Sequence, residues 1–501
     1  MSHRLPSPRN FHLRLSQETT LDNHDLKPVP PSKRTWRAID WISYWISDQF
    51  APAAWQLGAS MAATGVTARA AIPAVFFGLL CVGVVMWAAG VIGAPYHVAF
   101  PVINRAPWGI YGSLFPVALH PHRDRRQPYR AAPDFSITSI RQYVQLLTRK
   151  CKHHFEGFFF RFKAIVCPPA FVAIGIWALV KTKEGGELVR GPVTAGAWPI
   201  IVALNAAITI YCTVAVNISV FTRFSKTSKD TWQQVLLLPI TGTIPCACGF
   251  FAADATLTFR AWTSFGALIF LIATIGVNIS ANAISFATDA MSVWPAYIDI
   301  RRGCALAAVL AVAITRWNLL HSAQGFLNFL GAYGCWLGPI SGICLVDYYF
   351  LRRQRLDVRQ LYTHPGGMYS YSKWGVNPRA YLAFMVAFLP NLPGFINAIN
   401  PKVHLDVPIY KFNWLFGISV GALVYGVLCK YIWLLPKESL VQEAVYPDEA
   451  YFWNHEEEMA STEKSAADAE KVEGGGSESP SSGSFEGMEV DIVFAKTDKK
   501  Q

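Results

Sequence analysis

Two asparagines stand four residues apart inside an apolar stretch. Asn278 and Asn282 occur in 'ATIGVNISANAISFATD', and this spacing places both side chains on one face of a helix. Each carboxamide offers hydrogen-bond donors and an acceptor, so the pair can bind the edge of a planar ligand rich in amide groups. Hydrogen bonding between helices is the structural alternative. Polar groups inside a membrane helix are costly, which makes both residues candidates for function.

Asp48 is a carboxylate inside another apolar run, 'YWISDQFAPAAW'. Pro52 follows closely and interrupts a helix, because proline has no N–H and its ring clashes with the preceding turn. Transporters commonly bind substrates and ions at such breaks, where backbone groups are free. We expect Asp48 to carry a proton or to hold a cation. A carboxylate at the membrane surface, or one satisfied by a neighbouring helix, is the alternative.

Tyr211 lies in a third apolar run, 'ITIYCTVAVNISVFTRF'. Its ring can stack on a flat heterocycle, an interaction worth about 1–3 kcal/mol per base; simple packing between helices is the alternative. The chain has no phosphate-binding loop, nucleophile elbow, zinc-binding His–Glu pattern or nucleotide fingerprint. We therefore predict that the protein is not an enzyme and has no catalytic residue, metal site or cofactor.

The elements that must position these residues follow from composition. Of 501 residues, 52% are hydrophobic and only 15% are charged, whereas a soluble protein carries about a quarter of its residues as charges. The formal charge of +11 divides unevenly, because residues 436–501 hold 16 acidic and 6 basic side chains and the rest of the chain is strongly basic. This pattern excludes an ordinary cytosolic enzyme, and predicts a bilayer-embedded protein with basic cytoplasmic loops and no nucleic-acid partner.

An all-α polytopic membrane protein is the predicted fold class. A bilayer-crossing helix needs about 20 apolar residues, and ten windows qualify: 41–64, 71–94, 163–181, 197–220, 235–253, 262–287, 304–320, 326–346, 378–398 and 412–435. Lys and Arg gather in the even-numbered loops, so the positive-inside rule places both termini in the cytoplasm. The domains are then a cytoplasmic tail over 1–40, a transporter domain over 41–435, and an acidic, disordered cytoplasmic tail over 436–501.

One segment of the transporter domain departs from this pattern. Residues 118–162 are polar and basic, and ten Lys and Arg, counted through Lys163, face three acidic residues. A loop that binds anionic lipid headgroups is one interpretation. A corrupted or alternatively spliced gene segment is the other.

Several motifs, in the same order along the chain, resemble the nucleobase–cation symporter-1 family, most closely its fungal uracil, allantoin and uridine permease branch. They include 'RTWRAIDWISYWISDQFAPAAWQLGASM', 'GAPYHVAFPVINRAPWGIYGSLFPV', 'GVNISANAISFATDAMSVWPAYIDIRRG' and 'NPRAYLAFMVAFLPNLPGFINAI'. The resemblance implies import of a nucleobase-like solute across the plasma membrane, driven by a proton or Na+ gradient. It also implies twelve spans, of which the first ten form two inverted five-helix repeats with the substrate between broken helices.

The resemblance assigns roles to individual residues. Asn282 matches the asparagine of helix eight that binds substrate, and Asn278 lies one turn before it. Tyr211 matches the aromatic position of helix six that stacks on the ring, and Ser47 falls near the helix-one position whose backbone carbonyl helps to hold the cation.

The departures from the family also carry predictions. Gly276 and Val277 replace the two hydroxyl residues that bind sodium in relatives, so proton coupling is expected. Val220 stands where the family has an aspartate after helix six. Helices three and four are not recognisable between 118 and 162, which leaves about ten spans, and a shorter loss falls around 252–265. The competing hypothesis is therefore a transport-inactive membrane protein or a truncated, mis-spliced gene product.

Overall fold

The computed structural model describes residues 26–119, 154–181, 196–253, 260–294, 297–298, 300–313, 323–363, 366–400, 403–405, 407–447 and 452. The chain divides into two units, Met1–Asp448 and Glu449–Gln501, and the first contains all the helices described here. Most of the atypical stretch 118–162 and of both predicted tails lies outside the described residues.

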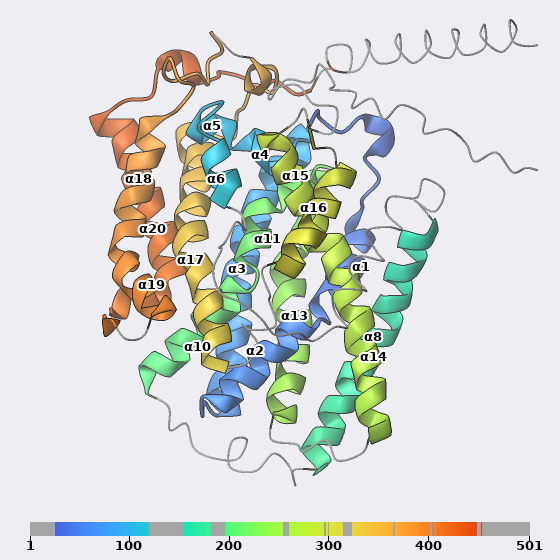
Figure 1. Cartoon of the computed structure of the whole chain (residues 1–501). Coiled ribbons are helices and arrows are strands. Elements are labelled where there is room, and N and C mark those ends of the chain that lie inside the picture. The colour runs from blue at the N-terminus through green and yellow to red at the C-terminus, as the bar shows by residue number, and fades with distance from the viewer. Residues whose placement is uncertain are drawn as a thin grey trace, which may run out of the picture. The chain divides into compact units, whose positions relative to one another are not determined.

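Helices make up almost all the regular structure of the described residues (Figure 1). The main helices are α1 (Ala38–Gln49), α2 (Pro52–Ala63), α3 (Ala68–Tyr96), α4 (Phe100–Ile103), α5 (Arg105–Trp108), α6 (Leu114–Leu119), α8 (His154–Lys181), α10 (Ala197–Thr209), α11 (Cys212–Asn217), α12 (Ser219–Thr222), α13 (Gln234–Ala252), α14 (Arg260–Val277), α15 (Ile284–Val293), α16 (Ile300–Ala313), α17 (Ala323–Val346), α18 (Pro378–Phe388), α19 (Leu392–Ile399) and α20 (Asn413–Val427). Helical structure thus occurs in all ten predicted windows.

Six helical segments of the described chain are long and apolar enough to cross a membrane: Ala68–Tyr96, Lys163–Lys181, Ser228–Ala252, Leu330–Leu351, Pro378–Ile399 and Pro408–Ile432. The prediction of about ten spans goes beyond these six, because several other windows consist of shorter helices joined at breaks. The exact span number and the inverted repeat remain predictions.

Small residues allow the helices to approach closely. α2 packs against α13, and a Cβ atom at Gly58 would lie only 1.8 Å from the carbonyl oxygen of Cys246. α17 packs against α20 in the same manner, since a Cβ atom at Gly342 would lie 2.2 Å from the carbonyl oxygen of Ile418. Membrane helices gain little from burying apolar surface, so close packing of this kind is a main source of their association.

The three predicted windows that carry candidate site residues are interrupted rather than continuous. The first is split between α1 and α2, as Pro52 predicted, and Pro52 begins α2. The window 197–220 breaks at Tyr211, whose φ of −112° and ψ of 2° lie outside the α-helical region. Between α14 and α15 the chain forms a π-helix, Asn278–Ala283. π-helical turns are frequent at functional sites.

A buried ionic network joins the segment after α17 to the rest of the bundle. The Nε atom of Arg352 lies 2.5 Å from Oδ2 of Asp347, and Arg352 is 2% exposed. Its guanidinium also donates to the carbonyl oxygens of Ser439 and Ala106 and to the hydroxyl of Tyr371. Each partner lies in a different segment, so one arginine connects four parts of the chain.

Residues 433–447, here called the C-terminal strap, run back across the same end of the bundle. The backbone of Val445 bonds Leu356 and Val358, and the ring of Tyr446 stacks on Tyr96 with centroids 5.4 Å apart. Residues 436–447 belonged to the predicted disordered tail. They are instead held by backbone hydrogen bonds that sequence composition does not report.

Candidate substrate and coupling site

The last turn of α1 presents an unusual run of buried polar groups. Ser47, Asp48 and Gln49 are 5%, 3% and 0% exposed. The helix stops here because Pro52 cannot donate to the carbonyl of Asp48. The N–H of Ala51 bonds Gln49 O at 2.8 Å, whereas a continuous helix would direct it to Ser47 O. The break therefore turns backbone carbonyls of Ser47 and Asp48 away from helical partners.

The break at Tyr211 lies opposite this turn. The rings of Trp45 and Tyr211 meet edge to face, with centroids 6.3 Å apart. The carboxylate of Asp48 interacts electrostatically with both Tyr44 and Tyr211. The structure thus brings together three residues predicted from sequence, Ser47, Asp48 and Tyr211, at the junction of two broken helices.

Lys163 is a residue of this junction that sequence reasoning missed. It was counted with the basic stretch before the third window, but its side chain is 0% exposed and interacts electrostatically with Asp48. A Cβ atom on Gly276 would lie 2.4 Å from Cδ of Lys163 and 2.9 Å from Nζ. Glycine at position 276 therefore leaves the space that the lysine occupies. The pairing of a lysine inside 'RFKAIVCPPAF' with a glycine in a distant helix has no signal in a single sequence.

This arrangement bears on the coupling ion. Gly276 and Val277 offer no side-chain oxygen, and the ammonium of Lys163 lies beside Gly276. A fixed cation and a sodium ion would repel each other at this distance. The residues present therefore do not fit a sodium ion here. In the described residues no group of three His, Cys, Asp or Glu side chains could hold a metal.

Gln49 is the second residue that sequence reasoning passed over. Both its carboxamide nitrogen and its oxygen are buried without a hydrogen-bond partner among the described residues. A Cβ atom on Gly242 would lie 2.6 Å from Gln49 Oε1, so the carboxamide extends between α1 and α13. A buried amide without partners is costly and marks a place where a ligand or water can bind.

The two predicted asparagines lie together in the π-helix. Asn282 Nδ2 donates to Asn278 Oδ1 at 2.9 Å. Asn282 is exposed and Asn278 is half-buried. No hydrogen bond within the described residues connects either asparagine to Asp48 or Tyr211. The predicted site residues thus form two groups, one at the helix junction and one on the π-helix.

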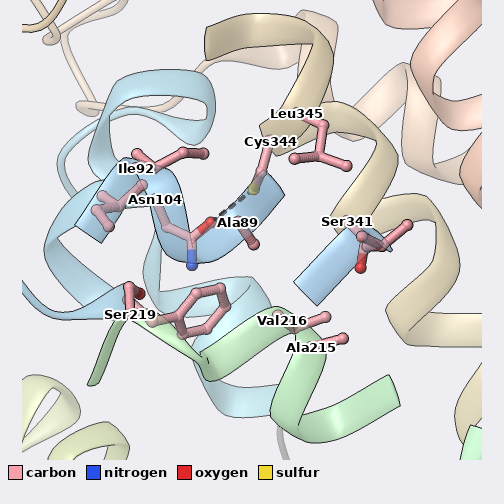
Figure 2. A pocket seen from close by; sticks show the side chains of 12 residues that line it. Ala89, Ile92, Asn104, Ala215, Val216, Ser219, Ser341, Cys344 and Leu345 are labelled. Atoms are coloured by element: carbon pink, nitrogen blue, oxygen red, sulfur yellow. Dashed lines mark hydrogen bonds between the residues drawn. The ribbon is translucent and has the colours of Figure 1, made fainter. Parts of the chain in front are cut away.

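A separate cavity lies between α3, α4, α11 and α17 (Figure 2). Its volume of about 20 Å³ suits a single water molecule and excludes a nucleobase. Asn104 is fully buried there, and its Oδ1 accepts a hydrogen bond from Cys344 Sγ at 3.0 Å. None of the residues predicted to bind substrate lines this cavity.

Comparison with known proteins identifies a family for the sequence and a related fold for the structure. The family described as permeases for cytosine/purines, uracil, thiamine and allantoin matches residues 28–120 and 153–417. The match omits 121–152, inside the stretch where helices three and four were not recognisable. It continues through 252–265, where the shorter loss was expected.

Individual relatives agree with this assignment. An uncharacterised permease of Schizosaccharomyces pombe is 29% identical, over 87% of this chain and 88% of its own length. The uridine permease of Saccharomyces cerevisiae is 27% identical, over 90% of this chain and 81% of its own. The structure of Mhp1, a nucleobase-cation-symport-1 family transporter in a closed conformation with bromovinylhydantoin bound, matches with a TM-score of 0.61 at 19% identity, covering 84% of this chain and 98% of its own. These relatives do not favour the transport-inactive alternative. The chain belongs to the nucleobase–cation symporter-1 family and is a membrane permease.

Proposed function

We propose that this permease imports a uracil-, allantoin- or uridine-like solute across the plasma membrane by proton symport and alternating access, with both termini in the cytoplasm. The observation that carries the proposal is the junction of two broken helices, where Trp45 of α1 contacts Tyr211 and α8 packs against α1. Broken helices that meet at an ionisable pair are typical of secondary transporters. The named solute classes come from the relatives and from the family description.

Five groups bind the solute in this proposal. The ring of Tyr211 stacks on the flat heterocycle. Asn282 and Asn278 bind its amide edge, and their mutual hydrogen bond at 2.9 Å sets the orientation of the two carboxamides. The carbonyl of Ser47, turned from its helical donor by the break, accepts a hydrogen bond or faces a positive charge. Gln49 adds an unsatisfied amide close to the same turn.

Asp48 and Lys163 couple the solute to protons. The carboxylate and the ammonium attract each other across the α1–α8 interface. When Asp48 takes up a proton, that attraction is lost, and α1 separates more easily from α8. Lys163 supplies the fixed positive charge that a bound cation supplies in sodium-coupled transporters. Proton binding and the movement of α1 are linked in this manner.

Uptake of labelled uracil, allantoin and uridine by transporter-deficient yeast cells tests the proposal. We expect uptake of at least one solute, stimulated by acidic medium and abolished by a protonophore. Asn282→Ala should lower uptake about tenfold or more, in keeping with the loss of one substrate hydrogen bond. The matched control Asn397→Ala lies outside the site. Equal uptake by wild type and Asn282→Ala would remove the asparagine from the site, and no uptake of any solute by wild type would reject transport itself.

A further inference from the structure

A second contact joins the two interrupted segments that carry the proposed binding residues. Asn217, the last residue of α11, donates from Nδ2 to Oδ2 of Asp289 in α15 at 3.4 Å. Both side chains are buried, with exposures of 1% and 3%. This hydrogen bond joins α11 directly to α15.

The position of this bond along the two helices relates it to the proposed substrate site. From Tyr211 to Asn217 the chain advances six residues, and from Asn282 to Asp289 seven, which is about 9 Å and about 10 Å at helical rise. The segments α10–α11 and α14–α15 run toward the same end of the bundle (Figure 1). The bond therefore lies beyond the proposed substrate residues by nearly the same distance on both sides.

The end of the bundle that the bond faces is the one proposed to be cytoplasmic. Just beyond Asn217, the carbonyl of Arg223 bonds His97 Nδ1 at 2.9 Å, at the end of α3. Tyr96, the neighbouring residue, stacks on the C-terminal strap. α15 also contacts α4, which belongs to the same end. A bond at this level lies between the proposed site and the cytoplasm.

We propose that the Asn217–Asp289 hydrogen bond is a latch that closes the cytoplasmic side of the substrate site and breaks when solute is released inward. The inference rests on the proposed function, because it assigns a gate to that site. A bond of 3.4 Å is long, so it can break in every cycle. It is also charge-assisted and buried, so its presence shifts the closed–open equilibrium measurably.

Cysteine labelling of the purified full-length protein tests the latch. Ser219 is 2% exposed and lies two residues after Asn217, so Ser219→Cys reports access from the cytoplasmic side when a water-soluble maleimide is added; the parent without it gives the background. We expect Asn217→Ala and Asp289→Ala each to raise the labelling rate about tenfold, equivalent to about 1.4 kcal/mol. The double variant should label no faster than either single variant.

A charge-swapped pair separates a latch from a merely structural contact. Asn217→Asp combined with Asp289→Asn keeps one amide donor and one carboxylate acceptor, and should restore slow labelling. All variants must elute as single peaks in gel filtration. Unchanged labelling in both single variants, additive effects in the double variant, or fast labelling in the swapped pair would overturn the latch. The labelling needs no transport, so a latch without uptake would reject the proposed function alone.

Discussion

Two buried polar clusters in the same bundle are built in opposite ways. At the end of α17, Arg352 binds Asp347 and donates to partners in three further segments. At the end of α1, the carboxamide of Gln49, the indole N–H of Trp45 and the ammonium of Lys163 have no hydrogen-bond partner among the described residues. Burial is nearly complete in both places.

Hydrogen-bond partners distinguish buried polar groups that stabilise the fold from buried polar groups that serve function. A buried polar group with all its partners contributes to one defined fold, whereas one without partners costs stability in the same environment. A protein retains that cost where a ligand or a moving charge later supplies the partner. By this criterion the Arg352 network stabilises the fold, whereas the polar groups at the end of α1 serve binding and transport. Apolar substitution should have opposite effects on stability in the two clusters.

The largest effect is expected at Arg352. Arg352→Met leaves Asp347 buried without its cation, and breaking a buried ion pair costs about 3–5 kcal/mol. We expect most of the folded, detergent-purified protein to be lost, as measured by gel filtration and thermal unfolding. Arg353→Asn is the matched control, because this neighbour is exposed and its φ of 52° is one that asparagine tolerates. An unchanged melting temperature for Arg352→Met would show that the Arg352 network does not stabilise the fold.

At the junction, the paired substitution Lys163→Met with Asp48→Asn removes both charges together. The Lys163 ammonium has no hydrogen-bond partner among the described residues, so removing both buried charges also removes their desolvation cost, which amounts to several kcal/mol per ion, on the order of the attraction that is lost. We expect the melting temperature to stay or rise, while proton-driven uptake disappears. Lys181→Met, at the exposed end of the same helix, should leave both unchanged. Normal proton-dependent uptake by the double variant would exclude this pair from coupling.

Two buried glutamines sharpen the contrast at a smaller scale. Gln49→Met removes an amide without partners, so we expect stability to rise by about 1–3 kcal/mol and the KM for uptake to increase. Gln234 is equally buried, but its Nε2 donates to Thr231 O at 3.0 Å, and only its Oε1 lacks a hydrogen-bond partner among the described residues. Gln234→Met should therefore lower stability and leave KM unchanged. If both variants shift the melting temperature in the same direction, hydrogen-bond satisfaction does not separate the two kinds of site.

The smallest effect on stability is expected at His97, whose ring has a hydrogen-bond partner, the carbonyl oxygen of Arg223. Burial and, to a smaller extent, the nearby Arg34 lower the pKa of His97 from 6.5 to about 4, and the hydrogen bond to Arg223 O opposes this shift. The neutral ring is favoured in the folded state, so its stabilisation is full above pH 6.5 and is lost as the pH falls toward 4. His97→Asn keeps the left-handed backbone and cannot titrate, and should flatten the melting-temperature profile between pH 6.5 and 4. Equal profiles for wild type and variant would contradict this role.

Much of the fold could be predicted from the sequence, because membrane helices are long apolar runs and proline breaks are local. The interruption before Pro52 is an example. Burial of Lys163 could not be predicted, since it depends on a glycine far away in α14. The order of residues 436–447 was missed for a similar reason, because their hydrogen bonds involve the backbone and carry no compositional signal. The roles of Asn282 and Tyr211 were predicted from residue type and from family resemblance, and they stay predictions.

The C-terminal strap has a consequence for how the protein is made. Tyr96 ends a helix that leaves the ribosome early, yet its ring is covered by Tyr446, and Arg352 meets the carbonyl of Ser439. Both partners lie more than 300 residues after Tyr96 in the sequence, so they are translated long after α3. A chain stopped before the strap would lack both contacts, leaving the ring of Tyr96 and the guanidinium of Arg352 without these partners. The strap therefore joins helices made early to residues made late, so the packing of this end of the bundle is completed only when the strap is in place.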